Sequence, residues 1–256
     1  MDILVCVKHV VDSTEVRVDK KSGEIVLRGI PTKINDYDKN AIEEAVRIKQ
    51  TTGGTVTLLT VGPKEAFKTV KEGLAMGADK AYLIDEGGVN LDDPIQVAKV
   101  LAAGIKKLGK FDLIFCGTVS EDRGNSLTGP SLAEWLDMEH VAYVNKVDVE
   151  PDGLTVERRV DQVMETINSQ LPVVLTVDRS INTPRLPTAL QVMKVQANRI
   201  VKWIIDDLGL EEPTGNHVHF TGFKVVPAER KRIVIEGDMK TASEQLMRHL
   251  VEEGVL

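Results

Sequence analysis

The sequence comprises 256 residues, 42% of them hydrophobic, and carries a formal net charge of −7. A chain of this length buries one large core, or a core with an extension, and its negative charge disfavours nucleic acid and membrane surfaces as partners. No apolar run approaches 20 residues and no basic stretch precedes the first one. We therefore expect no secretory signal, no membrane insertion and a cytoplasmic or matrix-like compartment.

Short apolar runs alternate with longer amphipathic segments through the first half of the chain. The runs at 3–7, 56–61, 81–84 and 113–116 are typical of strands that are buried on both faces. Segments with helical periodicity separate them, and one more follows Pro130. Strands that alternate with helices predict an α/β, Rossmann-like fold, with an open, mostly parallel sheet and helices on both faces.

Two regions depart from this alternation. Residues 15–19 and 24–28 alternate polar and apolar side chains around a KKSG turn, which predicts a β-hairpin over a sheet edge or another subunit. Apolar runs within 141–167, with a tight turn at 151–153, predict an appended antiparallel pair. Residues 173–177 then predict one more buried strand.

The sequence beyond residue 183 is less typical of an independent core. Prolines interrupt it at 184 and 187, a short helix is predicted at 188–193, and the segment 200–205 is expected to bury little of itself. The last amphipathic segment, with Leu246 and Leu250 on one face, requires an apolar surface that a partner can supply. We therefore divide the chain into an α/β nucleotide-binding domain, 1–183, and a C-terminal arm, 184–256.

The stretch 112–130, DLIFCGTVSEDRGNSLTGP, predicts a strand, a polar loop and a helix that opens at Gly129-Pro130. Thr128 would then offer its hydroxyl beside helix N–H groups that have no intrahelical partner, and such a helix end attracts anions. The spacing of Gly124 and Gly129 resembles a P-loop, but Pro130-Ser131 replace the Lys-Ser/Thr pair. The pattern favours nucleotide binding without NTP hydrolysis. An ordinary βα loop is the alternative.

No constellation of catalytic residues is recognisable. Cys6 and Cys116 lie within apolar runs, as small core residues do. His217 and His219 have no third metal ligand near them in sequence, so no metal site is predicted. Residues 8–12 follow the first strand without a G-x-G-x-x-G motif, which disfavours an ordinary Rossmann dinucleotide site.

Several segments, in order along the chain, resemble the β subunit of electron transfer flavoproteins. They are VKHVVD (7–12), TEVRVD (14–19), INDYDKNAIEEA (34–45), LTVGP (59–63), AMGAD (75–79) and INTPRLP (181–187). The stretch 156–176, VERRVDQVMETINSQLPVVLT, is similar to the family signature, although Gln162-Val163 replace a small or acidic pair. The resemblance covers nearly the whole chain.

This resemblance implies an electron carrier and not a stand-alone enzyme. Its β subunit pairs with an α subunit that holds most of a redox FAD, and electrons pass from a donor dehydrogenase to an acceptor oxidoreductase. The β subunit also holds an adenine nucleotide, either AMP or, in bifurcating relatives that oxidise NADH, a second FAD. A module that senses nucleotides without carrying electrons is a further alternative.

The resemblance also assigns the residues of the nucleotide site. Adenine and ribose would contact Cys6, Lys8, Asn35 and Val61, and the phosphates would contact Asp122, Asn125, Ser126, Leu127, Thr128 and Gly129. Thr128-Gly129 is similar to the AMP-binding type, whereas Pro130 and the segments at 14–19 and 38–45 are similar to the anaerobic type. Arg123 matches neither, and we interpret it either as a contact to phosphate or partner, or as a solvated side chain.

The family's recognition loop, which docks on acyl-CoA dehydrogenases through a leucine, falls at 187–194. Ala189 occupies the leucine position and Leu190 follows it, with Met193 one turn later. Either the anchor has shifted by one residue, or the electron donor is a different protein. We therefore predict that Ala189, Leu190 and Met193 form a partner-docking site.

Overall fold

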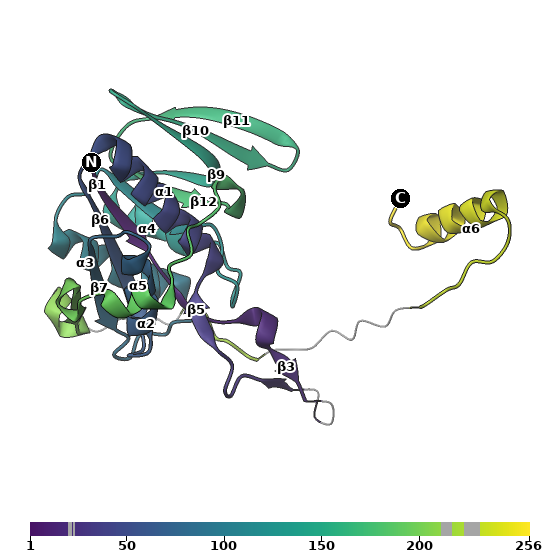
Figure 1. Ribbon diagram of the computed structural model, residues 1–256, viewed down its shortest axis with the longest axis horizontal. Coiled ribbons are helices and arrows are strands. Elements are labelled where there is room, and N and C mark those ends of the chain that lie inside the picture. The colour runs from purple at the N-terminus through teal and green to yellow at the C-terminus, as the bar shows by residue number, and fades with distance from the viewer. Residues whose placement is uncertain (20–21, 23, 211–216, 223–230) are drawn as a thin grey trace.

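The computed structural model of the chain describes residues 1–19, 22, 24–210, 217–222 and 231–256. A nine-stranded, mostly parallel sheet forms its centre, and helices cover both faces of that sheet (Figure 1). The predicted α/β architecture is therefore confirmed.

The sheet runs in the order β11-β10-β9-β12-β8-β1-β6-β7-β13. Its strands are β1 (Asp2–Cys6), β6 (Thr55–Gly62), β7 (Lys80–Asp85), β8 (Leu113–Gly117), β9 (Glu139–Glu150), β10 (Gly153–Val160), β11 (Val163–Ser169), β12 (Val173–Val177) and β13 (Ile200–Trp203). All pairs are parallel except β9 with β10 and β10 with β11. The predicted antiparallel addition is confirmed.

Successive residues of the central strands point to opposite helical layers. Ile3 and Val5 of β1 belong to one buried cluster, with side chains of α1 and α2, whereas Leu4 and Cys6 belong to a second cluster, with side chains of α3 and α4. The helices are α1 (Asp36–Thr52), α2 (Ala66–Ala75), α3 (Pro94–Leu108), α4 (Thr128–Leu136), α5 (Ala189–Lys194) and α6 (Met239–Glu252). Short 3-10 turns lie at Ser13–Glu15, Arg179–Ile181, Ala197–Arg199 and Ile205–Leu208.

Two small sheets extend from the carboxyl ends of the central strands. The predicted hairpin is confirmed as β3 (Arg17–Val18) paired with β4 (Ile25–Val26), and it projects beyond the main sheet in Figure 1. A second pair, β2 (His9–Val11) with β5 (Thr32–Ile34), was not predicted from the sequence. It joins the chain after β1 to the start of α1.

Part of the predicted arm belongs to the central sheet. β13 pairs in parallel with the edge strand β7, and the Ile200 and Ile205 side chains are buried. The ring of Trp203 lies 4.7 Å from that of Tyr82, centroid to centroid. The expectation that residues 200–205 bury little of themselves is right for Val201 and Ile204, which are exposed, and wrong for Ile200 and Ile205, because the open edge of β7 offers a pairing partner and an apolar surface.

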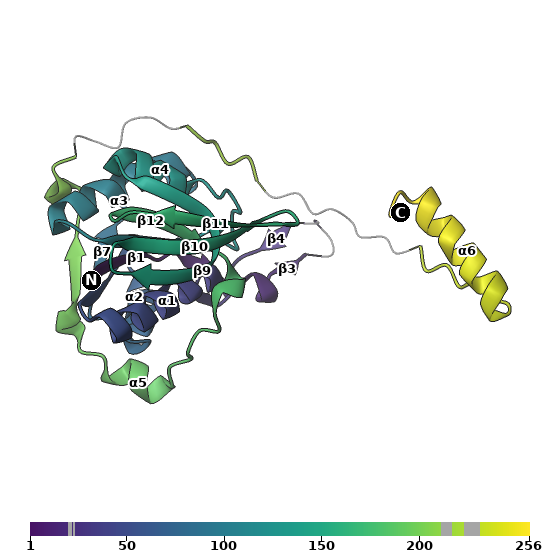
Figure 2. The ribbon, with the colours of Figure 1, turned by 90° about the horizontal axis from the view of Figure 1, so that it is seen from above.

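The last helix, α6, buries none of its side chains. It lies away from the sheet in both views of the chain (Figures 1 and 2). Its apolar side chains include Leu246, Met247 and Val251, each about half exposed. In the described part of the chain, every helix is too short or too polar to cross a membrane.

Candidate functional site

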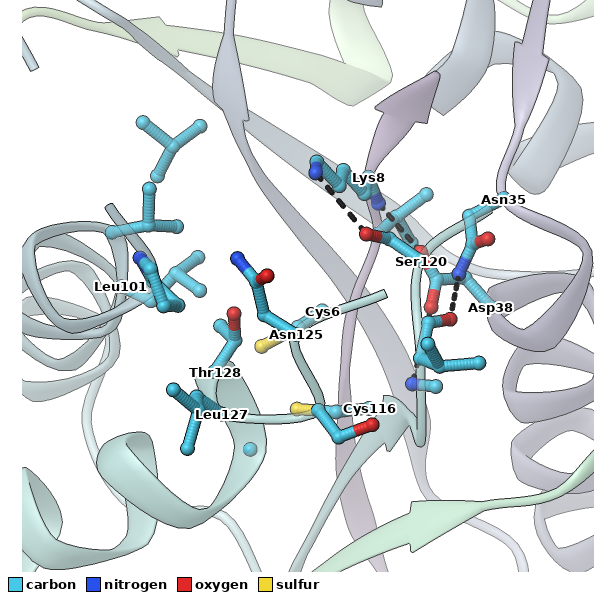
Figure 3. A pocket seen from close by; sticks show the side chains of 18 of the residues that line it. Cys6, Lys8, Asn35, Asp38, Leu101, Cys116, Ser120, Asn125, Leu127 and Thr128 are labelled. Carbon is cyan, nitrogen blue, oxygen red and sulfur yellow. Dashed lines mark hydrogen bonds between the residues drawn. The ribbon is translucent and has the colours of Figure 1, made fainter. Parts of the chain in front are cut away.

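A pocket opens at the carboxyl ends of β1 and β8 (Figure 3). The chain runs from β1 outward to β6 and β7, and then crosses back to place β8 on the other side of β1. Such a reversal is the topological switch point of an open α/β sheet, where ligands of this class of fold bind. The sheet order therefore positions this pocket before any side chain is considered.

The structure brings nearly all the predicted nucleotide contacts together. The walls of the pocket include Cys6, Lys8, Asn35, Val61 and the loop residues Asn125, Ser126, Leu127, Thr128 and Gly129. Asp122 lies beside the pocket, where its carboxylate accepts a hydrogen bond from Lys8 Nζ at 2.8 Å. Contact with a nucleotide stays a prediction for each of these residues.

The helix that follows the loop, α4, begins two residues before Pro130, earlier than predicted. α4 begins at Thr128 with Leu127 at the N-cap position, and no side chain caps it. Ser126, whose φ is +54°, turns the chain before this start, and Pro130 then falls within the first turn, where a missing N–H leaves no hydrogen bond unmade. The placement of Thr128 just before the helix is therefore wrong, but its N–H and that of Gly129 remain among the unpaired first-turn groups.

Gly129 lets the start of α4 approach the sheet closely. A Cβ atom at this residue would lie 2.2 Å from Thr176 Cγ2 on β12. Thr176 is buried, so its methyl group has little room to withdraw. The glycine thus fixes the distance between this helix end and the floor of the pocket.

Lys8 supplies the positive charge of the site. Besides its bond to Asp122, its ammonium donates to Ser120 Oγ at 3.3 Å. Burial raises the pKa of Asp122, but the neighbouring ammonium of Lys8 outweighs it and the pKa lies below its ordinary value. Ion pairing with Lys8 therefore keeps this carboxylate charged beside the loop.

The opposite side of the pocket is apolar. Leu91, Pro94, Val97 and Leu101, from α3 and the chain just before it, line the pocket. Figure 3 shows Leu101 across the pocket from Lys8 and Asn35. Thr118 also lines the pocket, is 7% exposed, and its hydroxyl has no hydrogen-bond partner among the described residues. An apolar surface and an unpaired buried hydroxyl suit a base attached to a polar sugar.

Sequence reasoning missed Asp38, which lines the pocket from the first turn of α1. Sequence reasoning also missed the apolar wall of the pocket, because its side chains have the spacing of an ordinary buried helix face. The signal for Asp38 was weak: an acidic residue near a helix start is common and usually serves the helix itself.

Arg123 is held within the protein. Its Nε lies 2.6 Å from Asp92 Oδ1, and its guanidinium carbon is 4.3 Å from the ring centroid of Phe220. Close by, the backbone N–H of His217 donates to buried Asp93 at 2.6 Å. The interpretation of Arg123 as a solvated side chain is therefore wrong, and residues 217–222 lie against the start of α3, beside the loop.

The three predicted docking residues lie on α5, outside the pocket. Leu190 is 60% exposed and Met193 74% exposed, and Ala189 is also exposed. The helix begins with a capping box between Thr188 and Gln191. The capped start of α5 thus holds an apolar surface in solvent.

Among the described residues, no group of His, Cys, Asp and Glu side chains has the arrangement of a metal site.

The sheet order and the switch-point pocket define an α/β protein of the Rossmann-like class. A family profile described as "Electron transfer flavoprotein domain" matches residues 23–208. The chain belongs to the electron transfer flavoprotein family, and its role in electron transfer follows from that membership.

The similar proteins include two that are named electron transfer flavoprotein subunit beta. The electron transfer flavoprotein subunit beta of Thermoanaerobacterium thermosaccharolyticum is 36% identical over 261 residues and covers 100% of both chains. That of Clostridium acetobutylicum is 33% identical over 99% of both. The caffeyl-CoA reductase-Etf complex subunit CarD of Acetobacterium woodii is 37% identical over 82% of this chain and 80% of its own. The resemblance to the β subunit is therefore confirmed.

Proposed function

We propose that the chain is the β subunit of a heterodimeric electron transfer flavoprotein whose switch-point pocket holds an adenine nucleotide. The subunit assembles with an α subunit, takes electrons from a donor dehydrogenase and passes them to an acceptor oxidoreductase through an FAD shared with α. That FAD, when bound, supplies the redox chemistry. The observation that carries the proposal is the convergence of Lys8, Asn35 and the start of α4 on one pocket.

The residues of the pocket fit an adenine nucleotide. The apolar surface of Val97 and Leu101 packs against the base, and the Thr118 hydroxyl is available to the ribose or the base. The first N–H groups of α4 are directed to the phosphate, where the helix end favours negative charge. Lys8 adds a cation, which Asp122 and Ser120 orient.

Two exposed apolar surfaces are suited to protein partners. Leu190 and Met193 on α5 form the surface that we assign to the electron donor, following the position of the family's recognition loop. The apolar face of α6 is assigned to the α subunit, because a helix with no buried side chain gains its stability from packing. Residence in the cytoplasm stays a prediction.

A second FAD in this pocket, with NADH oxidation, is the alternative. Its support is the segments of the sequence that are similar to the anaerobic type, together with similarity to a subunit of a caffeyl-CoA reductase complex. The visible spectrum of the complex purified with its α subunit tests both readings. One flavin per heterodimer, unchanged by NADH, is expected for the electron carrier. Two flavins that NADH bleaches would favour the alternative, and no flavin would contradict both.

A further inference from the structure

A buried carboxyl group lies at the point where β1 and β8 diverge. Asp38 belongs to the first turn of α1, is 4% exposed and lines the pocket. A charged side chain is rarely so buried without partners that offset its lost hydration. The hydrogen-bond partners of Asp38 include two backbone N–H groups of the site and the side chain of Asn35.

Its two oxygens bind the ends of both strands. Asp38 Oδ2 accepts the N–H of Lys8 at 2.7 Å, just after β1, and Oδ1 accepts the N–H of Gly117 at 3.1 Å, at the end of β8. The two strands pair in register up to Val5 and Phe115, so the carboxylate bridges them where their own ladder stops. One side chain therefore sets the spacing of the two backbones that border the pocket.

Gly117 leaves room for this arrangement. A Cβ atom there would lie 2.4 Å from Asp38 Oδ1 and 2.7 Å from Tyr37 Cβ. Those distances are too short for any side chain, although the φ of Gly117 is not in the left-handed region. The glycine is thus required by the close approach of Asp38 and Tyr37 and not by the backbone conformation.

Asn35 extends the same contact to the loop. Its Nδ2 donates to the Val119 carbonyl at 2.9 Å, and its Oδ1 accepts the N–H of Glu121 at 3.1 Å. The loop segment that it holds carries Ser120 and Asp122, which bind the Lys8 ammonium. The start of α1 therefore positions the residues of the polar wall of the pocket (Figure 3).

We propose that Asp38 is a positioning residue for the nucleotide pocket, and that its ionised form holds Lys8 and Gly117 in the arrangement that binds nucleotide. The inference rests on the proposed function, because it takes an adenine nucleotide as the ligand. Asp38 acts through the backbone of its neighbours. Its role differs from direct charge contact with the ligand.

Asp38 changes its protonation state near neutral pH. Burial raises the pKa of this carboxyl to about 7, even though the N–H groups of Lys8 and Gly117 favour the charged form. Protonation removes the negative charge that the two N–H donors bond to, so it weakens the bridge. Nucleotide affinity should therefore increase as the pH rises through 7. Repulsion between a carboxylate and a phosphate would give the opposite sign.

The other titratable groups around the pocket are Cys6, Lys8, His9 and Cys116, and Asp122 lies beside it. The Cys116 hydrogen bond and burial raise the pKa of Cys6, and burial lowers that of His9. Both shifts move these groups away from the interval between pH 7 and 8. Comparison of two proteins that differ only at residue 38 cancels the effect of these other groups on the pH dependence of nucleotide affinity.

The test measures AMP binding to the full chain by calorimetry at pH 6, 7 and 8, for the wild type, Asp38→Asn and Asp36→Asn. Asn keeps one acceptor oxygen but presents an NH₂ group to the second N–H. Asp38→Asn should therefore bind AMP about tenfold more weakly at pH 8, the loss expected for one hydrogen bond to a charged group. The difference should shrink toward pH 6. Asp36, in the same turn, pairs with Lys33 and Lys39 outside the pocket, so its variant serves as the control.

Equal affinity of Asp38→Asn and wild type at pH 8 would overturn the inference and leave the nucleotide pocket intact. Failure of the wild type to bind AMP or FAD would overturn the proposed function and the inference together. If Asp38→Asn does not fold, FAD binding to the wild type decides, because its phosphodiester groups do not titrate between pH 6 and 8. FAD affinity that rises with pH supports positioning, and affinity that is flat or falls contradicts it.

Discussion

Substitution of Gly129 by Ala tests whether close contact between α4 and β12 holds the phosphate end of the pocket in place. The added Cβ would lie 2.2 Å from Thr176 Cγ2, far inside contact distance, and Thr176 is buried. Either the methyl group or the helix start must move. Overpacking of a buried site costs about 1–3 kcal/mol, and we expect a loss of unfolding free energy in that range. The N–H groups of residues 128 and 129 would shift with the helix, so nucleotide affinity should fall as well.

The structure supplies a matched rescue and a matched control. Thr176→Ser removes Cγ2 and keeps the hydroxyl, so the double variant of Gly129→Ala with Thr176→Ser should recover most of the loss. Gly62→Ala is the control, because a Cβ at Gly62 would lie 3.6 Å from Ala66 Cβ, an ordinary contact. Urea unfolding of the wild type, Gly129→Ala, Thr176→Ser and the double variant yields the coupling energy between residues 129 and 176. A Gly129→Ala variant within about 0.5 kcal/mol of the wild type, or losses that simply add, would refute the reasoning.

Three further predictions concern other parts of the chain. Burial raises the pKa of the Glu43 carboxyl, but contact with Arg185 outweighs burial and lowers that pKa to about 2. The ionised carboxylate therefore stabilises the folded protein fully above pH 4.5, and this stabilisation is lost as the pH falls toward 2. Glu43→Gln should thus lower the unfolding free energy by about 2–3 kcal/mol at pH 7 and by less at pH 3, and a loss independent of pH would argue against the ion pair. Arg123→Ala should speed amide hydrogen exchange in residues 217–222 by releasing Phe220. Unchanged exchange would mean that the contact between Arg123 and Phe220 does not stabilise this segment. Leu190→Ala should slow electron transfer from the donor without loss of flavin, and normal transfer would remove α5 from the docking site.

The order of strands and helices was predictable because buried parallel strands carry long apolar runs. The loop at the end of β8 was predictable for a similar reason, since the end of a buried strand is marked by the abrupt change at Gly117. The short strands β2, β5 and β13 were not predicted. β13 has four residues, too few to show a period of two, and it forms because the edge of β7 pairs with it.

The details of the pocket depend on contacts that are remote in sequence. Asp38 meets Lys8 and Gly117, which are 30 and 79 residues away, and nothing local distinguishes it from other acids near helix starts. The start of α4 was misplaced because Leu127 is a residue that seldom occupies the N-cap position, whereas the Thr128-Gly129-Pro130 pattern is typical of one.

The number and identity of the nucleotides in the assembled protein test the central claim most directly. The chain would be co-expressed with its α subunit, the purified complex denatured, and the released nucleotides identified and counted by chromatography and mass spectrometry. We predict one FAD and one further adenine nucleotide, AMP or a second FAD, for each heterodimer. A single FAD with no other nucleotide would contradict the assignment of the pocket between β1 and β8.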